Sequence, residues 1–182
     1  KTEMRRMLDC AVRQSGCDLI LCRAVLKGSA LDQLVGGRQL KGPANAASML
    51  DLSGFASPED YVGQLGKLQK RNRNRRRNHL ARLGELHFSV IWPDDAEFST
   101  LLELCIAMKR RWLEETGKIS TGFAMRGVDD FLGTLSGDHQ SLSGACLSVL
   151  RAGDSVVAVE LGFIHHNHYY AYLGGFDWEL RQ

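Results

Sequence analysis

A run of basic side chains from Lys67 to Arg82, KLQKRNRNRRRNHLAR, is the part of this sequence best suited to chemistry with anions. It holds eight Lys and Arg residues and no acid, whereas the rest of the chain has 15 basic and 21 acidic side chains and therefore a net charge of −6. A cationic block on an acidic body indicates one particular anionic partner, such as a phosphate, a nucleotide or RNA.

Three arginines of this block are candidate binding residues. If residues 57 to 83 form one helix, its apolar residues make a single stripe: Tyr61, Leu65, Leu68, Leu80 and Leu83. Arg76 falls on that stripe, where an unpaired buried charge is costly. We therefore expect Arg73, Arg76 and Arg77 to clamp phosphates or an acidic acceptor. Two alternatives are arginines that are solvated or paired with the acidic body, and an arginine-rich helix that binds RNA, with Arg on phosphates and Asn on base edges.

Two carboxylates near the end of the chain are candidate catalytic residues. Glu160 lies in the middle of an apolar run, and its same-face neighbours Ala158 and Gly162 are small enough to leave room for a substrate. A carboxylate so placed can act as a general base on an acceptor amine or hydroxyl; the alternatives are a salt bridge to the basic helix or a solvent-facing residue. Asp177 follows an aromatic run and either acts as a base or caps the turn there.

Aromatic and imidazole side chains cluster between these two carboxylates. Tyr172 is a candidate substrate-binding residue, and cross-strand packing is the alternative. His165, His166 and His168 fall on a predicted hairpin tip, without a cysteine or carboxylate at ligand spacing. The sequence therefore predicts no metal site.

Hydrophobic periodicity predicts the elements that position these residues. Helices are expected at 3–15, 57–83, 95–115 and 128–135, and strands at 17–25, 48–52, 86–92, 145–151, 156–164 and 168–176. Ser57 is the expected N-cap of the basic helix and Gly84 its stop. From Glu85 onward the order is strand, helix, helix and three strands, which is an α/β pattern.

Three stretches of sequence carry a resemblance to a known family. They are YVGQLGKLQKRNRNRRRNHLARLGEL, the helix end KRRWLEETG, and RAGDSVVAVELGFIHHNHYYAYLGGFDWEL. From about Asp51 to Gln182 the chain resembles the CelD/BcsL group of GNAT-type acetyltransferases, which is associated with cellulose and other polysaccharide biosynthesis and related to the FemAB-like enzymes. The resemblance implies an α/β (α+β) fold of GNAT type, with a mixed, mostly antiparallel sheet flanked by helices.

The resemblance also implies a domain organisation. Residues 1–55 are expected to be the closing part of a preceding GNAT-like unit, and residues 56–182 the basic helix with the first part of a CelD/BcsL-like domain. In this family the aromatic strand leads into a loop that holds the cofactor pyrophosphate. We expect that loop after Gln182, so the sequence is interpreted as an incomplete window of a tandem-GNAT protein.

The function implied by the resemblance is acyl transfer from acetyl-CoA. The expected reaction is N- or O-acetylation of a sugar or envelope-polysaccharide precursor, by direct attack on the thioester with one general base. The alternatives are a non-catalytic module that uses the arginine-rich helix for RNA or another polyanion, and an aminoacyl-tRNA-dependent FemAB-like transferase.

Composition completes the expectations about partners and compartment. No window holds the roughly 18 continuous apolar residues of a membrane span, and no signal-peptide pattern opens the chain. We therefore expect a cytoplasmic protein without a membrane span, whose partner is a small-molecule or saccharide acceptor. An incomplete sheet also exposes an edge strand, which a homodimer would cover.

Overall fold

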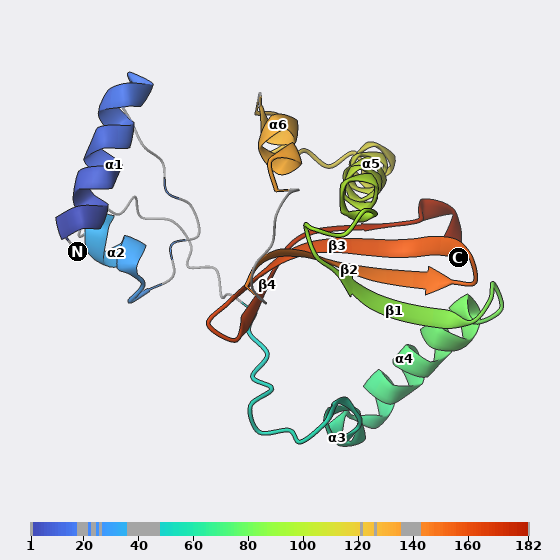
Figure 1. Ribbon diagram of the computed structural model, residues 1–182. Coiled ribbons are helices and arrows are strands. Elements are labelled where there is room, and N and C mark those ends of the chain that lie inside the picture. The colour runs from blue at the N-terminus through green and yellow to red at the C-terminus, as the bar shows by residue number, and fades with distance from the viewer. Residues whose placement is uncertain are drawn as a thin grey trace. The chain divides into compact units, whose positions relative to one another are not determined.

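The computed structural model describes residues 2–17, 22, 25, 27–35, 48–120, 122–125, 127–135 and 143–181. The chain divides into two compact units, residues 1–63 and residues 64–182 (Figure 1). Three helices lie in the first unit or at its end: α1 (Thr2–Ser15), α2 (Ala30–Val35) and α3 (Pro58–Gln64). The second unit holds one further basic helix, a sheet and the two helices inserted into it.

The regular elements described in the first unit are helices. The predicted helix at 3–15 is confirmed as α1, and the backbone N–H of Asp60 donates to the Ser57 hydroxyl at 3.2 Å, the N-cap contact expected for α3. The predicted strand at 48–52 is wrong: these residues have no regular structure and are exposed. The described part of this unit offers no strand with which their backbone groups could pair. Most of the predicted strand at 17–25 lies outside the described residues.

The second unit is built on a four-stranded antiparallel sheet in the order β1-β2-β3-β4. Its elements after the basic helix are β1 (Leu86–Ile91), α5 (Phe98–Thr116), α6 (Val128–Gly133), β2 (Gly144–Ala152), β3 (Ser155–His165), β4 (His168–Phe176) and the 3-10 helix η1 (Trp178–Arg181). The predicted order of strand, helix, helix and three strands is confirmed, and with it the α/β class.

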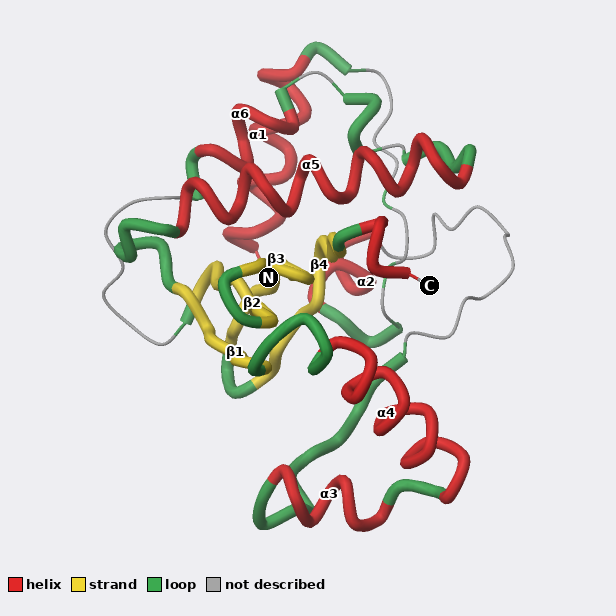
Figure 2. The backbone as a smooth tube through the Cα atoms, turned by 90° about the vertical axis from the view of Figure 1, so that its right-hand side faces the viewer, coloured by secondary structure: helices red, strands yellow, loops and turns green. Residues whose placement is uncertain are grey.

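The hydrophobic core lies between α5 and one face of the sheet (Figure 2). The helix contributes Phe98, Leu101, Leu102 and Cys105, and the strands contribute Leu147, Val149, Val159, Leu161 and Leu173. Alternation along each strand sends every second side chain to this face. Gly175 of β4 lies directly under α5, because a Cβ there would come within 2.7 Å of the Cys105 carbonyl oxygen.

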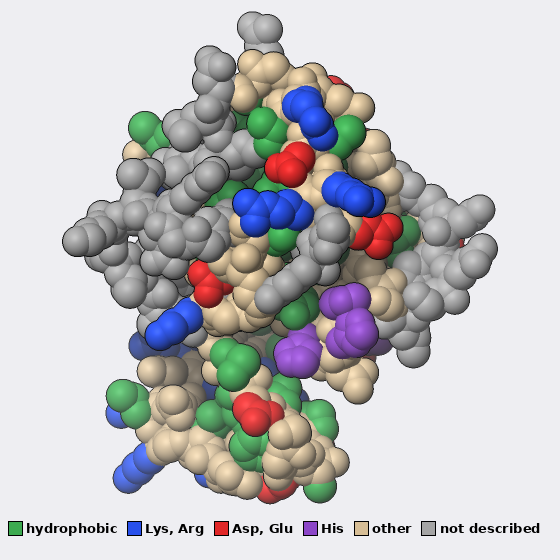
Figure 3. All heavy atoms as spheres, turned by 90° about the vertical axis from the view of Figure 1, so that its left-hand side faces the viewer, with side chains coloured by type: hydrophobic (Ala, Val, Ile, Leu, Met, Phe, Trp, Pro, Cys, Tyr) green, Lys and Arg blue, Asp and Glu red, His purple; other side chains and the backbone are tan. Residues whose placement is uncertain are grey.

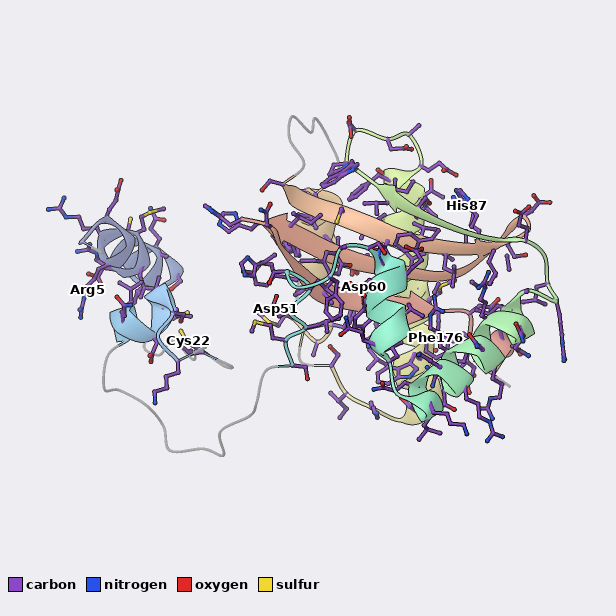
Figure 4. All side chains as sticks on the ribbon, turned by 90° about the horizontal axis from the view of Figure 1, so that it is seen from below. Arg5, Cys22, Asp51, Asp60, His87 and Phe176 are labelled. Atoms are coloured by element: carbon purple, nitrogen blue, oxygen red, sulfur yellow. The ribbon has the colours of Figure 1, made fainter. Side chains whose placement is uncertain are left out.

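The other face of the sheet keeps large side chains exposed. Phe88 is 61% exposed, Val90 42%, Tyr169 45% and Phe176 38%. The β1–β2 register pairs Phe88 with Leu150 and Val90 with Ser148, so this face continues across the sheet. Figure 4 looks at the molecule from this side, with Phe176 labelled. We call it the open face below.

The predicted continuous helix over 57–83 is wrong, because it is broken into α3 and α4 (Lys67–Leu80). Gly66 adopts an extended conformation (φ −63°, ψ 155°), and its N–H donates to Gln69 Oε1 at 3.0 Å. Glycine weakens the helix at this point, and the Gln69 side chain supplies half of a capping box that starts a new one. The predicted apolar stripe is therefore interrupted, and no residue of α4 is buried.

A close backbone contact joins the end of α4 to the sheet. Gly84 has φ 151°, and a Cβ at this position would lie 2.5 Å from the backbone nitrogen of Gly153. The Gly153 N–H donates to the Glu85 carbonyl at 2.9 Å. The glycine predicted to stop the basic helix therefore also lets the chain enter β1 against the β2–β3 turn.

Candidate functional site

Glu160 lies at the centre of the open face, on β3. It is paired with Ser148 of β2 on one side and with Gly174 of β4 on the other. The Tyr169 hydroxyl donates to Glu160 Oε1 at 2.7 Å, and Ser148 Oγ lies 3.4 Å from the same hydroxyl. Three neighbouring strands thus place a carboxylate, a phenol and a serine hydroxyl in one polar cluster. None of the described basic side chains forms an ion pair with Glu160, so the predicted alternative of a salt bridge to the basic helix is not observed there.

The space around Glu160 differs from the prediction on one side. The Tyr169 ring covers Gly162, because a Cβ at position 162 would lie 2.3 Å from that ring. The expected room beside Gly162 is therefore filled. Room remains on the β4 side, where a Cβ on Gly174 would meet only Glu160 Oε2, at 3.7 Å. One carboxylate oxygen is thus held by Tyr169, and the other borders the open space over Gly174.

The electrostatics of the cluster keep Tyr169 protonated, so that it is the donor in its hydrogen bond to Glu160. Burial raises the pKa of Tyr169 to about 12; the hydrogen bond with Ser148 opposes this shift, and the hydrogen bond to Glu160 and the charge of that carboxylate add to it. Tyr169 therefore stays a neutral donor at neutral pH. Burial, with a contribution from the Glu160 charge, also raises the pKa of Cys146. This neighbouring thiol is accordingly protonated and poorly suited to act as a nucleophile.

Asp177 makes the contact expected of a capping residue. Its Oδ1 accepts the N–H of Glu179 at 3.0 Å, which starts η1, and its own N–H donates to the Val157 carbonyl at 2.9 Å. Arg111 of α5 forms an ion pair with Glu179. Asp177 thus fixes the turn by which the chain leaves β4.

Tyr172 lies on the other side of the sheet, at a β-bulge. The register of β3 and β4 shifts between Leu161 and Gly162, and Tyr172 is the extra residue of β4. Its ring makes an edge contact with Phe163, at 5.7 Å between centroids. It also lines a pocket of about 210 Å³ together with Lys109, Ser120, Gly122, Phe123, Val128, Leu132 and Leu173. Tyr172 therefore both packs, as in the alternative interpretation, and borders a pocket between α5, α6 and β4.

Arg73, Arg76 and Arg77 belong to α4, on the open-face side of the sheet (Figure 1), but they are not part of the Glu160 cluster. All three are exposed on α4, which lies on the opposite side of the sheet from α5 (Figures 1 and 2). The premise that Arg76 occupies a packing face is wrong, because α4 buries no residue. Within the described part of the chain these arginines form no ion pair, and they do not line the pocket beside Tyr172.

The histidines predicted at a hairpin tip are found there. His166 and Asn167 have φ values of 47° and 59°, as the two central residues of a tight hairpin turn require. Figure 3 shows the imidazoles grouped on one surface. Among the described residues no group of three His, Cys, Asp or Glu side chains is arranged to hold a metal ion.

Sequence reasoning missed Tyr169 as the partner of Glu160. The available signal was the short His166–Asn167 turn, which pairs Ile164 with Tyr169 and places that aromatic ring diagonally across from Gly162. An aromatic side chain covering a cross-strand glycine is a recurrent packing arrangement in sheets.

The described fold and site define an α/β protein of GNAT type, with a carboxylate on the open face and a pocket on the other. Residues 67–182 match the model of the family described as Acetyltransferase (GNAT) domain, and the chain belongs to this family. Acyl transfer is thus the general chemistry of its class. Neither curated proteins nor solved structures gave a significant match to the sequence. None of the described helices has the length and apolar character needed to cross a bilayer.

Proposed function

We propose that this protein is an acetyl-CoA-dependent acetyltransferase of the CelD/BcsL type, acting in the cytoplasm on an amine or hydroxyl of a sugar or envelope-polysaccharide precursor. The family match supports the reaction class. The observation that carries the proposal is the Glu160–Tyr169 hydrogen bond, which holds a carboxylate on an accessible face of the sheet. A general base needs this combination of fixed orientation and access to substrate.

In the proposed reaction, Glu160 accepts the proton of the acceptor N–H or O–H group. Transfer would join the acceptor to the acyl carbon as the carbon–sulfur bond breaks, and the proton taken up by Glu160 would balance the thiolate that leaves. Tyr169 orients the base by donating to Oε1, which leaves Oε2 to receive the proton beside Gly174. Acetyl-CoA, when bound, supplies the activated acyl group.

The residues of β4 fit the extended arm of this cofactor. Within the described sheet, β4 pairs only with β3, so its other edge presents unpaired backbone N–H and C=O groups. An extended chain containing amides, such as the pantetheine arm, can bind along such an edge in the manner of an added strand. Gly174 removes side-chain bulk from the open-face side of β4.

The remaining candidates take binding and positioning roles in this proposal. Tyr172 and Glu160 lie on opposite faces, so a ligand reaches both only by passing over the β4 edge. We assign Tyr172 to binding of the acceptor, since an aromatic ring beside a pocket suits the apolar face of a sugar. Asp177 positions the turn after β4. Arg73, Arg76 and Arg77 bind an anionic group outside the pocket.

The test is an assay of acetyl transfer from acetyl-CoA to amino sugars and oligosaccharides. Turnover is measured as the free thiol that is released. Glu160→Gln should lower kcat about 10²- to 10⁴-fold with little change in the KM for acetyl-CoA. Tyr172→Ala should instead raise the KM for the acceptor. Glu103→Gln, an exposed change of the same kind on α5, is the matched control. Unchanged turnover in Glu160→Gln, with Glu103→Gln also active, would remove Glu160 as the base.

A further inference from the structure

The helix α4 is strongly cationic and contributes no side chain to the hydrophobic core. Seven of its 14 residues are Lys or Arg and none is acidic. The positively charged residues are Lys67, Lys70, Arg71, Arg73, Arg75, Arg76 and Arg77. None of its side chains is buried. A helix that buries no side chain gains little stability from packing, so its composition calls for another explanation.

The arginines of α4 are not neutralised by ion pairs with other described residues. Arg110, Arg111 and Arg151 pair with Asp129, Glu179 and Glu97. In contrast, the arginines of α4 have no ion pair among the described residues. Like charges three or four residues apart repel each other on one helix surface, at a cost of about 0.2–0.5 kcal/mol for each pair. Binding of a polyanion would remove this repulsion.

The distribution of charge around α4 indicates the shape of that polyanion. Successive residues of an α-helix are rotated by about 100°, so Arg75, Arg76 and Arg77 point in three different directions. A flat anionic surface can meet only one of these directions. The helix also lacks the continuous apolar stripe with which interfacial helices enter a bilayer. A groove with phosphates on both walls can engage several sides of the helix at once.

We propose that α4 binds in the major groove of a structured RNA, at a bulge or internal loop that opens the groove. The guanidinium groups would contact phosphates on both walls and the acceptor edge of guanine. Asn72, Asn74 and Asn78, interspersed with the arginines, would reach base edges. The major groove of B-DNA is about 8.5 Å deep, less than the 10–12 Å diameter of a helix, and leaves the outer side of a helix in water. The deeper groove of RNA encloses more of it. This site is separate from the Glu160 cluster, and its existence does not depend on the acetyltransferase proposal.

The test measures binding of the full chain to a fluorescent RNA hairpin with a purine-rich internal loop. A DNA hairpin of the same sequence and phosphatidylglycerol-containing vesicles serve as comparators, in KCl from 50 to 300 mM. The probe variant is Arg75→Gln/Arg76→Gln/Arg77→Gln. The matched control is Arg5→Gln/Arg6→Gln/Arg13→Gln, which removes three exposed charges from α1 and gives the same net charge. Gln keeps the helix propensity close to that of Arg.

The proposal expects the RNA to bind more tightly than the DNA and the vesicles. The α4 variant should weaken RNA binding at least tenfold at 150 mM KCl. It should also reduce the slope of the logarithm of the association constant against the logarithm of the KCl concentration by about 2 to 3. The α1 variant should change the affinity less than threefold. Asn72→Ala/Asn74→Ala/Asn78→Ala should reduce the preference for the looped hairpin over a plain stem, because it removes base contacts without changing the charge.

Several results would overturn this assignment. Equal losses in the two arginine variants would mean that only net charge matters. DNA bound as tightly as RNA would remove the groove argument, and preferential vesicle binding would point to a membrane surface. An absence of RNA binding at 50 mM KCl would show that the charge of α4 has a different role. Far-UV circular dichroism of each variant separates these results from loss of the fold.

Discussion

The two faces of the sheet differ in the exposure of the side chains that the same strands contribute to them. On the side of α5, Leu147 and Leu161 are 0% exposed, and Val149 and Val159 are 0% and 1% exposed. On the open face, Glu160 lies between Ser148 and Gly174, among exposed rings. Neighbouring residues of a strand face opposite ways, so side chains that pack in the core alternate along β3 with side chains of the candidate site. Substitutions one residue apart should therefore have different kinds of effect.

The largest expected difference is between core and open-face truncations. Leu161→Ala should destabilise the protein by about 2–5 kcal/mol, because it removes a fully buried side chain and leaves a cavity. Phe88→Ala should cost about 0.5 kcal/mol or less, because that ring is 61% exposed. Chemical denaturation of both variants, measured as the free energy of unfolding, checks this. A large loss in Phe88→Ala would mean that the open face is covered in the folded protein.

Two adjacent glycines give a finer form of the same comparison. Gly175→Ala should cost about 1–3 kcal/mol, because its Cβ would come within 2.7 Å of the Cys105 carbonyl oxygen and of Met108 Cβ, which forces α5 to move. Gly174→Ala should be neutral or slightly stabilising, because its Cβ meets only Glu160 Oε2, at 3.7 Å. Thermal unfolding of the two variants tests the difference. Equal effects would show that β4 does not lie against α5 as described.

The elements of the second unit could be predicted because each of them is specified locally. Buried residues alternate in β3 at Val157, Val159 and Leu161, and Phe98 and Leu101 have helical spacing in α5. The break between α3 and α4 could not be predicted in the same way. The helical spacing continues through it, and the competition between the helix and the Gly66–Gln69 cap decides the outcome.

The candidate site was predictable as a set of residues but not as an arrangement. Counting from the His166–Asn167 turn without a bulge would place Leu173 opposite Glu160. The bulge at Tyr172 instead puts Leu173 opposite Leu161 in the core, and Gly174 opposite Glu160. One inserted residue thus moves Leu173 from the open face into the core and creates the open space beside the carboxylate. Long-range packing favours this register, and the local pattern does not report it.

The raised pKa of Tyr169, caused first by burial and then by its contacts with Glu160, should appear in the dependence of stability on pH. The pKa of Tyr169 is about 12 in the folded protein, against about 10 in an unfolded chain. The folded state therefore holds the Tyr169 proton more tightly than the unfolded state does. The contribution of this proton to stability is complete below pH 10 and is lost as the pH rises from 10 to 12. For a half-exposed ring, solvent screening limits this loss to about 1 kcal/mol.

Tyr169→Phe is the variant that tests this behaviour. Its free energy of unfolding should fall less steeply between pH 10 and 12 than that of the unmodified protein, because the titrating group is gone. Tyr170→Phe, on the next residue of the same strand, is the control and should keep the steep decline. Identical pH profiles for the two variants would contradict the assignment of the shifted pKa to Tyr169.

The smallest effect in the comparison concerns the polar contact on the side of the sheet nearer α5. Arg151 Nη2 lies 3.1 and 3.2 Å from the two carboxylate oxygens of Glu97, but Glu97 is 61% exposed. A double-mutant cycle with Arg151→Gln and Glu97→Gln should give a coupling of about 0.5 kcal/mol that decreases with added salt. The matching cycle with Tyr169→Phe and Glu160→Gln should give about 1–2 kcal/mol, with little dependence on salt, because a neutral donor bonds directly to a partly buried carboxylate. Couplings in the reverse order would mean that the open face holds no fixed polar cluster, and Glu160 would then lack the orientation that its proposed role requires.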